Sequence, residues 1–361
     1  MVDPTVHVRR VGHADLRLCD GPVPHYKQIV RLGGAILEYM VDELGTAETL
    51  RRFSNPLWFE AFACVVGFEW QFSGATTVTL RALRDATEGK DVGIHILGGK
   101  GKQARTKELV PEELREPDVL TTKVDSALVQ DGYQIYFHSI LYDDEGHWTV
   151  VNQGMNTEMR LARRYHWCWE ENRYLDDAES IAGKREPVVL DLQTSESRET
   201  RKAIMDILRD ESPRNIVYTI LTLRRERGQK TLAEYLNVPE IDIVKMPFHL
   251  RIPRKVNEHA LQVAKNAESF LDLLKTPGLG PATIRGLAYI AALVYGAEPS
   301  WRDPVRYTFA FGTKAGVPWM VEREEMERAA QFLKNALDEA KLGHKEKKRA
   351  LMRLSRLLDE A

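Results

Sequence analysis

The sequence lacks long apolar segments and has few cysteines, and these absences argue against several classes of protein. No stretch of about eighteen consecutive apolar residues occurs, so we expect no transmembrane helix. The first residues, MVDPTVHVRRVGHADL, lack the apolar core of a secretory signal, and we therefore expect a cytoplasmic protein. The three cysteines, Cys19, Cys64 and Cys168, are far apart and form no CxxC pair, which argues against a disulfide scaffold or a zinc ribbon.

A strong net charge of either sign is also absent, since 51 Lys and Arg nearly balance 53 Asp and Glu. The net charge of −2 argues against a nucleic-acid partner at first sight, but the charge is unevenly distributed. Residues 248–361 carry a net charge of +5, and the remainder therefore carries −7. The basic excess is densest in 341–356, where Lys348 and Arg349 belong to one face of an expected helix. Such a face can follow phosphates, although a solvated surface helix has the same pattern.

The composition, with 43% hydrophobic and 29% charged positions, is typical of a globular protein. Two alternating runs around Asp-Asp-Glu-Gly predict a β-hairpin over 133–156. Strands are also expected at 92–99 and 187–192, and helices at 24–44, 55–70, 76–86, 198–209, 213–227, 230–236, 254–275, 281–295, 303–312 and 322–358. We therefore expect an α+β protein with two domains. A mixed N-terminal domain with a small antiparallel sheet spans 1–192, and an all-helical C-terminal domain spans 193–361.

A basic, glycine-rich segment, GGKGKQARTK (98–107), follows the first expected strand. It is not a Walker phosphate loop, because Ile94 stands where the first glycine is required and Gly101 stands where Ser or Thr is required. What remains is a flexible loop in which Lys100, Lys102 and Arg105 are candidate phosphate contacts. A surface loop that binds no ligand is an equally good interpretation.

The most informative segment is SFLDLLKTPGLGPATIRGLAYIAALVYG (269–296), where one apolar helix ends in Pro-Gly-Leu-Gly and a second begins at once. The glycines permit a tight turn and expose backbone N–H groups at the positive end of the second helix, where a phosphate oxygen can bind. We expect nucleic-acid contacts from Lys275, Gly278, Gly280, Ala282 and Thr283. A helical packing element without a ligand has the same pattern.

Over about 265–312 the chain resembles the DNA-binding helix-hairpin-helix of the base-excision DNA glycosylase superfamily. In that superfamily a catalytic aspartate begins the next helix, and here Asp303 stands 26 positions after Pro277. The resemblance implies a monofunctional glycosylase that hydrolyses the N-glycosidic bond of a damaged base flipped out of double-stranded DNA. Asp303 before Pro304 is equally typical of a simple helix cap. Across its whole length the chain also resembles a prokaryotic domain-of-unknown-function family.

Two departures from the superfamily narrow the implied chemistry. Members that also cut the DNA backbone carry a lysine just inside the second hairpin helix, where this chain has Ala282, so we do not expect a lyase. Members with an iron–sulfur cluster need four cysteines near the C-terminus, and no cysteine follows Cys168. We accordingly expect no cofactor and no metal.

The N-terminal half contains a second group of polar residues. The segment TKVDSALVQDGYQIYFH (122–138) supplies four further catalytic candidates, Lys123, Asp125, Asp131 and His138. Candidates for a base pocket are Gln153, Asn156, Tyr165, His166, Trp301 and Tyr307, most of which also suit a protein core. A metal-dependent nuclease with its site around Asp125 and Asp131 is the first alternative to a glycosylase, and a non-enzymatic, structure-specific nucleic-acid binder is the second.

Overall fold

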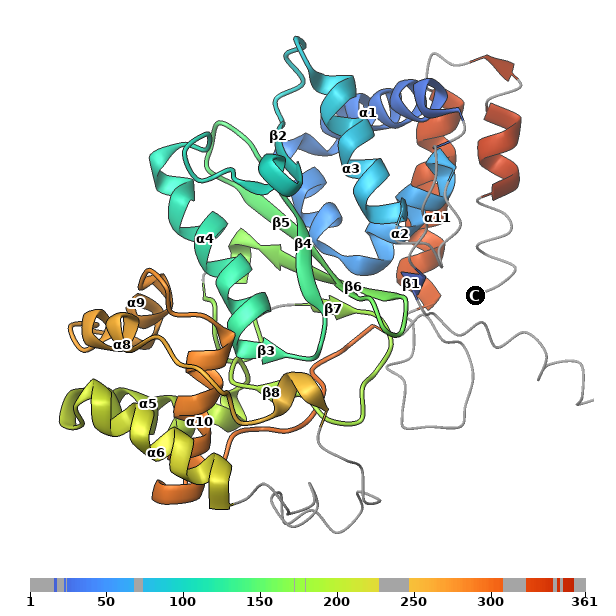
Figure 1. Cartoon of the computed structure of the whole chain (residues 1–361). Coiled ribbons are helices and arrows are strands. Elements are labelled where there is room, and N and C mark those ends of the chain that lie inside the picture. The colour runs from blue at the N-terminus through green and yellow to red at the C-terminus, as the bar shows by residue number, and fades with distance from the viewer. Residues whose placement is uncertain are drawn as a thin grey trace, which may run out of the picture.

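The computed structural model (Figure 1) describes residues 25–67, 74–171, 173–178, 180–226, 247–307, 323–339 and 347–353, together with 16–17, 23 and 343–344. Among these residues no helix is both long and apolar enough to cross a bilayer. Cys64 and Cys168 carry free thiols. Cys19 and the helix expected at 230–236 lie outside the described residues.

An antiparallel sheet of six strands forms the centre of the protein (Figure 1). Its order is β1-β6-β5-β4-β2, with β7 beside β6. The strands are β1 (Leu16–Arg17), β2 (His95–Lys100), β4 (Gln134–Tyr142), β5 (Trp148–Asn156), β6 (Leu161–Cys168) and β7 (Ser180–Ala182). A separate two-stranded sheet pairs β3 (Val129–Gln130) with β8 (Leu190–Asp191). The predicted α+β class and the predicted hairpin of β4 and β5 are confirmed.

One face of the large sheet packs against the N-terminal helices and part of the C-terminal region (Figure 1). These helices are α1 (Tyr26–Ser54), α2 (Pro56–Val66), α3 (Gly74–Thr87) and α11 (Arg323–Glu339), with a further helical segment at 347–353. Gly45, with φ of 79°, interrupts α1 where the sequence predicts its end. Asn55 begins α2 by accepting hydrogen bonds from the first turn. Leu333, Ala336, Leu337 and Ala350 share this core with α1 and α2.

The opposite side of the sheet carries a second core, formed with the remaining helices (Figure 1). They are α4 (Arg115–Lys123), α5 (Arg198–Asp210), α6 (Pro213–Glu226), α8 (Glu258–Ala264), α9 (Phe270–Lys275) and α10 (Pro281–Tyr295). Short 3-10 turns lie at 101–104, 112–114, 169–171, 195–197 and 248–250, and a π-helical turn at 124–128 continues α4. This core joins side chains from before and after residue 192, such as Leu120, Trp167, Ile204 and Leu287. The division into domains at that position stays a prediction.

Three predicted helices are wrong in part. The helix expected over 254–275 is two helices, because Asn257 and Ser269 each cap a new N-terminus with their side chains. The helix expected over 322–358 is interrupted at Gly343. Residues 303–307 of the helix expected over 303–312 are not helical: Tyr307 forms a parallel bridge with Ala182, and 308–312 lie outside the described residues.

Strand β6 distributes its polar side chains to both faces of the sheet. Successive residues of a strand point to opposite sides. Arg163 and Tyr165 therefore face the second core, where both contact Asp131. Arg164 and His166 face the N-terminal helices, where they contact Glu60 and the carbonyl of Phe53. Tyr165 and His166, which the sequence places together as candidates for one base pocket, lie on opposite faces.

Candidate functional site

The buried guanidinium of Arg163 joins two of the predicted catalytic residues. Its Nη1 donates to Asp131 Oδ2 at 2.9 Å and to Asp303 Oδ1 at 3.2 Å. Its Nη2 donates to Asp303 Oδ2 and to the carbonyl of Lys184. Burial lowers the pKa of Arg163, but Asp303 and Asp131 outweigh this effect and raise it well above its usual value. Asp131, Arg163 and Asp303 thus form one ionic cluster that ties β6 to the segment after α10.

The carboxylate of Asp303 is enclosed by hydrogen-bond donors. Besides Arg163, it accepts from the backbone N–H groups of Glu186 and Val305. Its side chain is only 1% exposed. Because residues 303–307 are not helical, Asp303 does not stand at the start of a helix as the resemblance implies. The carboxylate is therefore an internal anchor whose oxygens do not open to solvent.

Asp131 is similarly occupied. It accepts hydrogen bonds from the Tyr165 hydroxyl at 2.7 Å and from the backbone N–H of Tyr133 at 2.9 Å. Burial raises the pKa of Asp131, although Arg163 and these hydrogen bonds oppose the shift. The structure thus brings together three of the predicted residues, Asp131, Tyr165 and Asp303, but in an arrangement that is closed to solvent.

A second buried chain of hydrogen bonds contains Asp125 and His138. His138 Nε2 lies 2.9 Å from Asp118 Oδ1, and His138 Nδ1 lies 2.7 Å from Asn152 Oδ1. Asn152 donates to Asp125 at 2.6 Å, and Trp167 Nε1 donates to the other oxygen of Asp125 at 3.0 Å. This chain links α4 to three strands and is also closed to solvent.

The metal site expected for a nuclease has no support in this geometry. Asp125 and Asp131 each accept hydrogen bonds within separate buried networks. Within the described part of the chain, the only group of three His, Cys, Asp or Glu side chains close enough to share an ion is Asp143, Glu145 and His147, in the turn between β4 and β5. The carboxylate of Asp143 already accepts from Thr46 and His147, so this turn is explained by its own hydrogen bonds.

The turn between α9 and α10 is exposed and has the predicted backbone form. Gly278 has φ of 77°, a conformation that favours glycine. Gly280 is the N-cap of α10, and an added Cβ there would meet nothing within 4 Å. The N–H of Thr283 bonds to the carbonyl of Gly280. Ala282 lies in the first turn of α10, where N–H groups generally lack a carbonyl partner within the helix. The Thr283 side chain is buried and its backbone N–H is already bonded, so the structure does not present this predicted contact at the surface.

Two lysines lie beside this turn. Lys123 Nζ donates to the carbonyl of Leu279 at 3.4 Å, and burial lowers the pKa of Lys123. Lys275 pairs with Asp272 and Glu116. Lys123 is therefore placed at the hairpin rather than with Asp125, Asp131 or His138 in a common catalytic centre.

The other predicted basic contacts do not join the hairpin. Lys100, Lys102 and Arg105 are exposed around the 3-10 turn after β2, and the ammonium of Lys100 lies 5.5 Å from the ring centre of Tyr136. Lys348 and Arg349 are exposed on the segment 347–353, which packs with the N-terminal helices. The hairpin packs on the other side of the sheet (Figure 1). The predicted basic helix and the hairpin therefore do not form one continuous surface.

Next to Asp303 the structure has a small polar cavity that the sequence did not predict as a site. Its volume is about 110 Å³. The lining includes four acidic residues, two arginines and several smaller polar side chains: Asp177, Asp191, Glu196, Asp303, Arg302, Arg306, Gln193, Thr194 and Ser300, together with Pro304. Asp303 is paired with Arg163 and Glu196 with Arg302, so Asp177 and Asp191 are the acidic groups of the lining that these two arginines do not neutralise. When Asp191 is ionised, these two carboxylates favour a developing positive charge.

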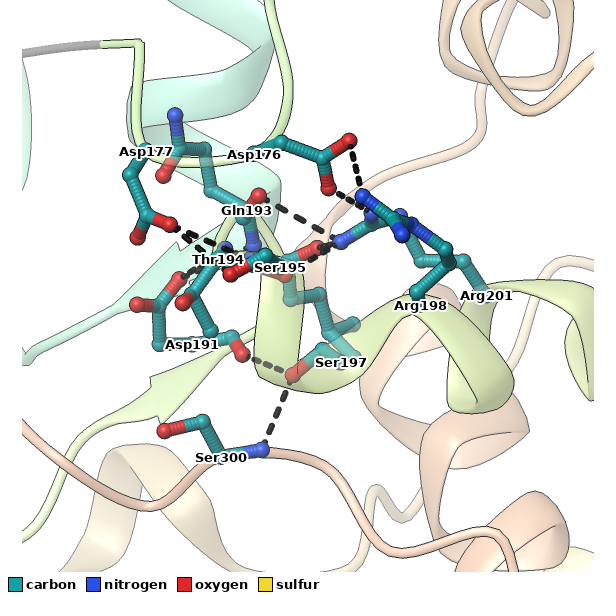
Figure 2. A network of polar contacts seen from close by, with 11 residues as sticks. Asp176, Asp177, Asp191, Gln193, Thr194, Ser195, Ser197, Arg198, Arg201 and Ser300 are labelled. Atoms are coloured by element: carbon teal, nitrogen blue, oxygen red, sulfur yellow. Dashed lines mark hydrogen bonds and ion pairs between the residues drawn. The ribbon is translucent and has the colours of Figure 1, made fainter.

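Asp191 is the central titrating group of this cavity. It ends the short strand β8, and its Oδ1 accepts from the backbone N–H groups of Gln193 and Thr194 (Figure 2). Burial raises the pKa of Asp191 to about 7, the two hydrogen bonds oppose the shift, and the charges of Asp177 and Asp303 add to it. A carboxyl group that titrates near neutral pH can both donate and accept a proton under ordinary conditions.

The loop beside Asp191 is fixed in an uncommon conformation. Asp176 and Asp177 both have positive φ, 61° and 68°, which is rare for residues with a side chain. Arg198 and Arg201 hold the carboxylate of Asp176, and Ser195 donates to that of Asp177 (Figure 2). Backbone strain held in place by such contacts is frequent at functional sites. The contacts keep Asp177 at the cavity, where its charge acts on Asp191.

The predicted base-pocket residues are dispersed. Trp301 packs against the Tyr289 ring, Tyr165 bonds to Asp131, and Asn156 accepts the N–H of Met159. Gln153 donates to the hydroxyl of Tyr136. The remaining two, His166 and Tyr307, line one large cavity of about 700 Å³ between β6, α11 and the junction of α1 and α2. These two are the only predicted base-pocket residues that line that cavity.

Sequence reasoning missed Asp191, Asp177 and Glu196. The available signal was weak: Asp191 ends a predicted strand and precedes the polar segment 194–200. An aspartate followed by such a segment is typical of a turn or a helix cap. Its raised pKa depends on burial by distant parts of the chain, among them Ser300, with which Asp191 forms an isolated bridge.

Comparison with known proteins gives one match. A search of curated proteins and a search of solved structures each found no match. Residues 12–321 match the family described as "Protein of unknown function (DUF763)", and this range includes both Asp191 and the hairpin. The chain therefore belongs to the DUF763 family.

Proposed function

We propose that the protein binds double-stranded DNA at the turn between α9 and α10 and hydrolyses the N-glycosidic bond of a flipped base at the cavity around Asp191. One observation carries the proposal: Asp191, which is 2% exposed and has a pKa of about 7, lines a cavity together with Asp177 and Glu196. Cleavage of a glycosidic bond needs an acid that can protonate the leaving group and negative charge near the sugar.

The reaction requires only water and the proton of Asp191. Protonated Asp191 donates its proton to the departing base while the C1′–N bond breaks. The electron pair of that bond leaves with the base. The negative charge of the cavity stabilises the oxocarbenium-like sugar. Water then forms the new C1′–O bond and returns a proton to the Asp191 carboxylate, which restores the starting state.

Asp303 acts in this account through its charge and not by contact with the sugar. Its oxygens are enclosed by Arg163 and two backbone N–H groups. It nevertheless lines the cavity wall, and its charge raises the pKa of Asp191. Asp303 is thus a positioning residue, and Asp191 takes the catalytic role that the resemblance alone assigns to Asp303.

The hairpin supplies the contact with the DNA backbone. The half-buried backbone of Gly280 and Ala282 at the start of a helix of 15 residues offers N–H groups and the positive end of the helix dipole. Lys123 lies beside it, whereas Lys275 is already paired with Asp272 and Glu116, so the backbone N–H groups carry the main part of the contact. Binding and chemistry then fall to separate surfaces of the protein.

The test is a panel of duplexes that contain uracil, hypoxanthine, oxidised or alkylated bases, incubated with the protein in EDTA. We expect release of a free base and an abasic site that alkali converts to a strand break. Direct strand cutting that requires Mg²⁺ or Mn²⁺ would instead assign a metal-dependent nuclease. Salt-dependent binding with no product on any duplex would assign a non-enzymatic binder.

A further inference from the structure

The largest cavity described above is a candidate binding site that the proposed chemistry does not use. It has a volume of about 700 Å³, within the range typical of small-molecule sites. Its lining residues come from four separate parts of the chain. They include Arg52, Trp58, His166, Tyr307, Phe332 and Asn335. The cavity is therefore formed only in the folded protein.

One wall of the cavity is aromatic. The rings of Trp58 and Phe332 lie 5.7 Å apart at a steep angle. The guanidinium of Arg52 lies 4.2 Å from the centre of the Trp58 ring and 4.7 Å from that of Phe332. Planar aromatic and guanidinium surfaces of this kind bind flat heteroaromatic rings by stacking.

The opposite strand supplies a buried hydrogen-bond acceptor without a partner. His166 is 1% exposed, and its Nδ1 lies 3.1 Å from the carbonyl of Phe53, so Nδ1 carries the proton. Burial and the nearby Arg164 hold the pKa of His166 well below its usual value, which keeps the ring neutral. Nε2 is then an acceptor, and no donor from the part of the chain that the structure describes reaches it. An unpaired buried acceptor is costly, and a ligand that donates an N–H removes that cost.

The charges of the cavity exclude a phosphate-rich ligand. Glu48, Glu170 and Glu171 line it together with Arg51 and Arg52. Both arginines pair with Glu48, so the cavity offers no concentrated positive charge to a phosphate group.

We infer that this cavity binds a nucleobase with an N–H donor, which stacks on the Trp58–Phe332 wall and donates to His166 Nε2. Because the charges of the cavity disfavour phosphate, the base is that of a free nucleoside. The inference goes beyond the proposed hydrolysis, since it uses neither Asp191 nor the hairpin.

Calorimetric titration of the whole chain with adenosine, guanosine, cytidine and uridine, and with their 5′-monophosphates, tests the inference. We expect at least one nucleoside to bind, and to bind more tightly than its monophosphate. The derivative of that nucleoside with its base N–H donors methylated should bind about tenfold more weakly or not at all. Binding of none of the nucleosides, or equal binding of the methylated derivative, would overturn the inference.

Variants give an independent reading of the same site. Trp58→Ala should weaken nucleoside binding about tenfold or more, because stacking is lost. His166→Phe should weaken it as well, whereas Tyr218→Ala, at an exposed ring away from the cavity, should leave it unchanged. Asp191→Asn should retain binding even if it abolishes base release, which separates this site from the proposed reaction. Unchanged affinity in both Trp58→Ala and His166→Phe would overturn the inference.

Competition tests the exclusion of phosphate. A single-stranded oligonucleotide should not displace the bound nucleoside, because its phosphates meet the acidic side chains of the cavity. Displacement at a concentration similar to that of the nucleoside would overturn the assignment of a free nucleoside.

Discussion

The guanidinium of Arg163 holds the carboxylate of Asp303, 140 positions later in the chain, and the same guanidinium holds Asp131. This contact fixes the segment after α10 against β6 and occupies the carboxylate of Asp303, whereas Asp191, at the end of β8, lines the same cavity and forms no ion pair with an arginine within the part of the chain that the structure describes. The contact explains why Asp303, which resembles a catalytic aspartate in its place in the sequence, is buried.

Arg163→Met should strongly destabilise the protein. It leaves the carboxylates of Asp131 and Asp303 buried without their cation, which costs about 3–5 kcal/mol in comparable buried pairs. Urea unfolding followed by circular dichroism measures the change. Arg302→Met is the matched control, because Arg302 pairs with Glu196 at the surface and such pairs contribute about 0–1 kcal/mol. Equal stability of the two variants would refute the structural role of the Arg163 cluster.

Asp191→Asn should change how stability depends on pH. The pKa of this carboxyl group is about 7 in the folded protein, whereas its ordinary value, which applies to the unfolded chain, is 3.8. The folded state therefore binds the proton more tightly than the unfolded state does. The free energy of unfolding therefore falls as pH rises from about 4 to about 7, by about 4 kcal/mol in total from this group. Asn keeps the acceptor for Gln193 and Thr194 but does not ionise, so the variant should lack this loss.

Unfolding measured at pH 5 and at pH 8 shows the difference. The exposed Asp206→Asn variant serves as the control and should follow the wild-type profile. If Asp191→Asn also followed the wild-type profile, the shifted pKa of Asp191 would be excluded.

The rate of base release should fall as pH rises through about 7, because the protonated form of Asp191 is the acid. Asp177→Asn should move this fall to lower pH, since the charge of Asp177 raises the pKa of Asp191. The measurement is kcat/KM as a function of pH for both proteins. A fall at the same pH in the variant would contradict the assigned coupling.

Gly280→Asp should weaken DNA binding without weakening the fold. The added side chain has open space, and Asp is favourable at the N-cap of a helix. Its negative charge, however, repels a phosphate at the same N–H groups. Gly280→Ser adds a capping side chain without charge and is the matched control. We expect the difference in DNA affinity between the two variants to shrink as the salt concentration increases. Equal DNA affinity of the two variants at low salt would show that the hairpin does not contact DNA.

Local patterns predicted those parts of the fold that depend on nearby residues. The hairpin of β4 and β5 follows from alternation around Asp143–Gly146, and the end of the first helical run at Gly45 follows from the conformational freedom of glycine. The break before α9 was missed because helical periodicity continues through it, although Ser269 at the new N-cap was a local signal. The alternation of β6 could also have separated Tyr165 from His166.

The candidate site could not be predicted to the same extent, because its properties come from contacts between distant segments. Asp303 is distinguished by its place in the sequence, but its burial depends on Arg163 and Glu186. Asp191 has an ordinary sequence context, and its pKa depends on burial and on charges at Asp177 and Asp303. The burial of Asp303 and the raised pKa of Asp191 therefore both depend on residues that are distant in the sequence.

Asp191 is proposed as the acid of a metal-independent base-releasing reaction. Comparison of the wild-type protein with Asp191→Asn on the panel of modified duplexes in EDTA, with free base measured by chromatography, tests this role. We expect the wild type to release a base and the variant to release none, with the affinity of both for DNA unchanged. Release of the base by Asp191→Asn at the wild-type rate would contradict this role.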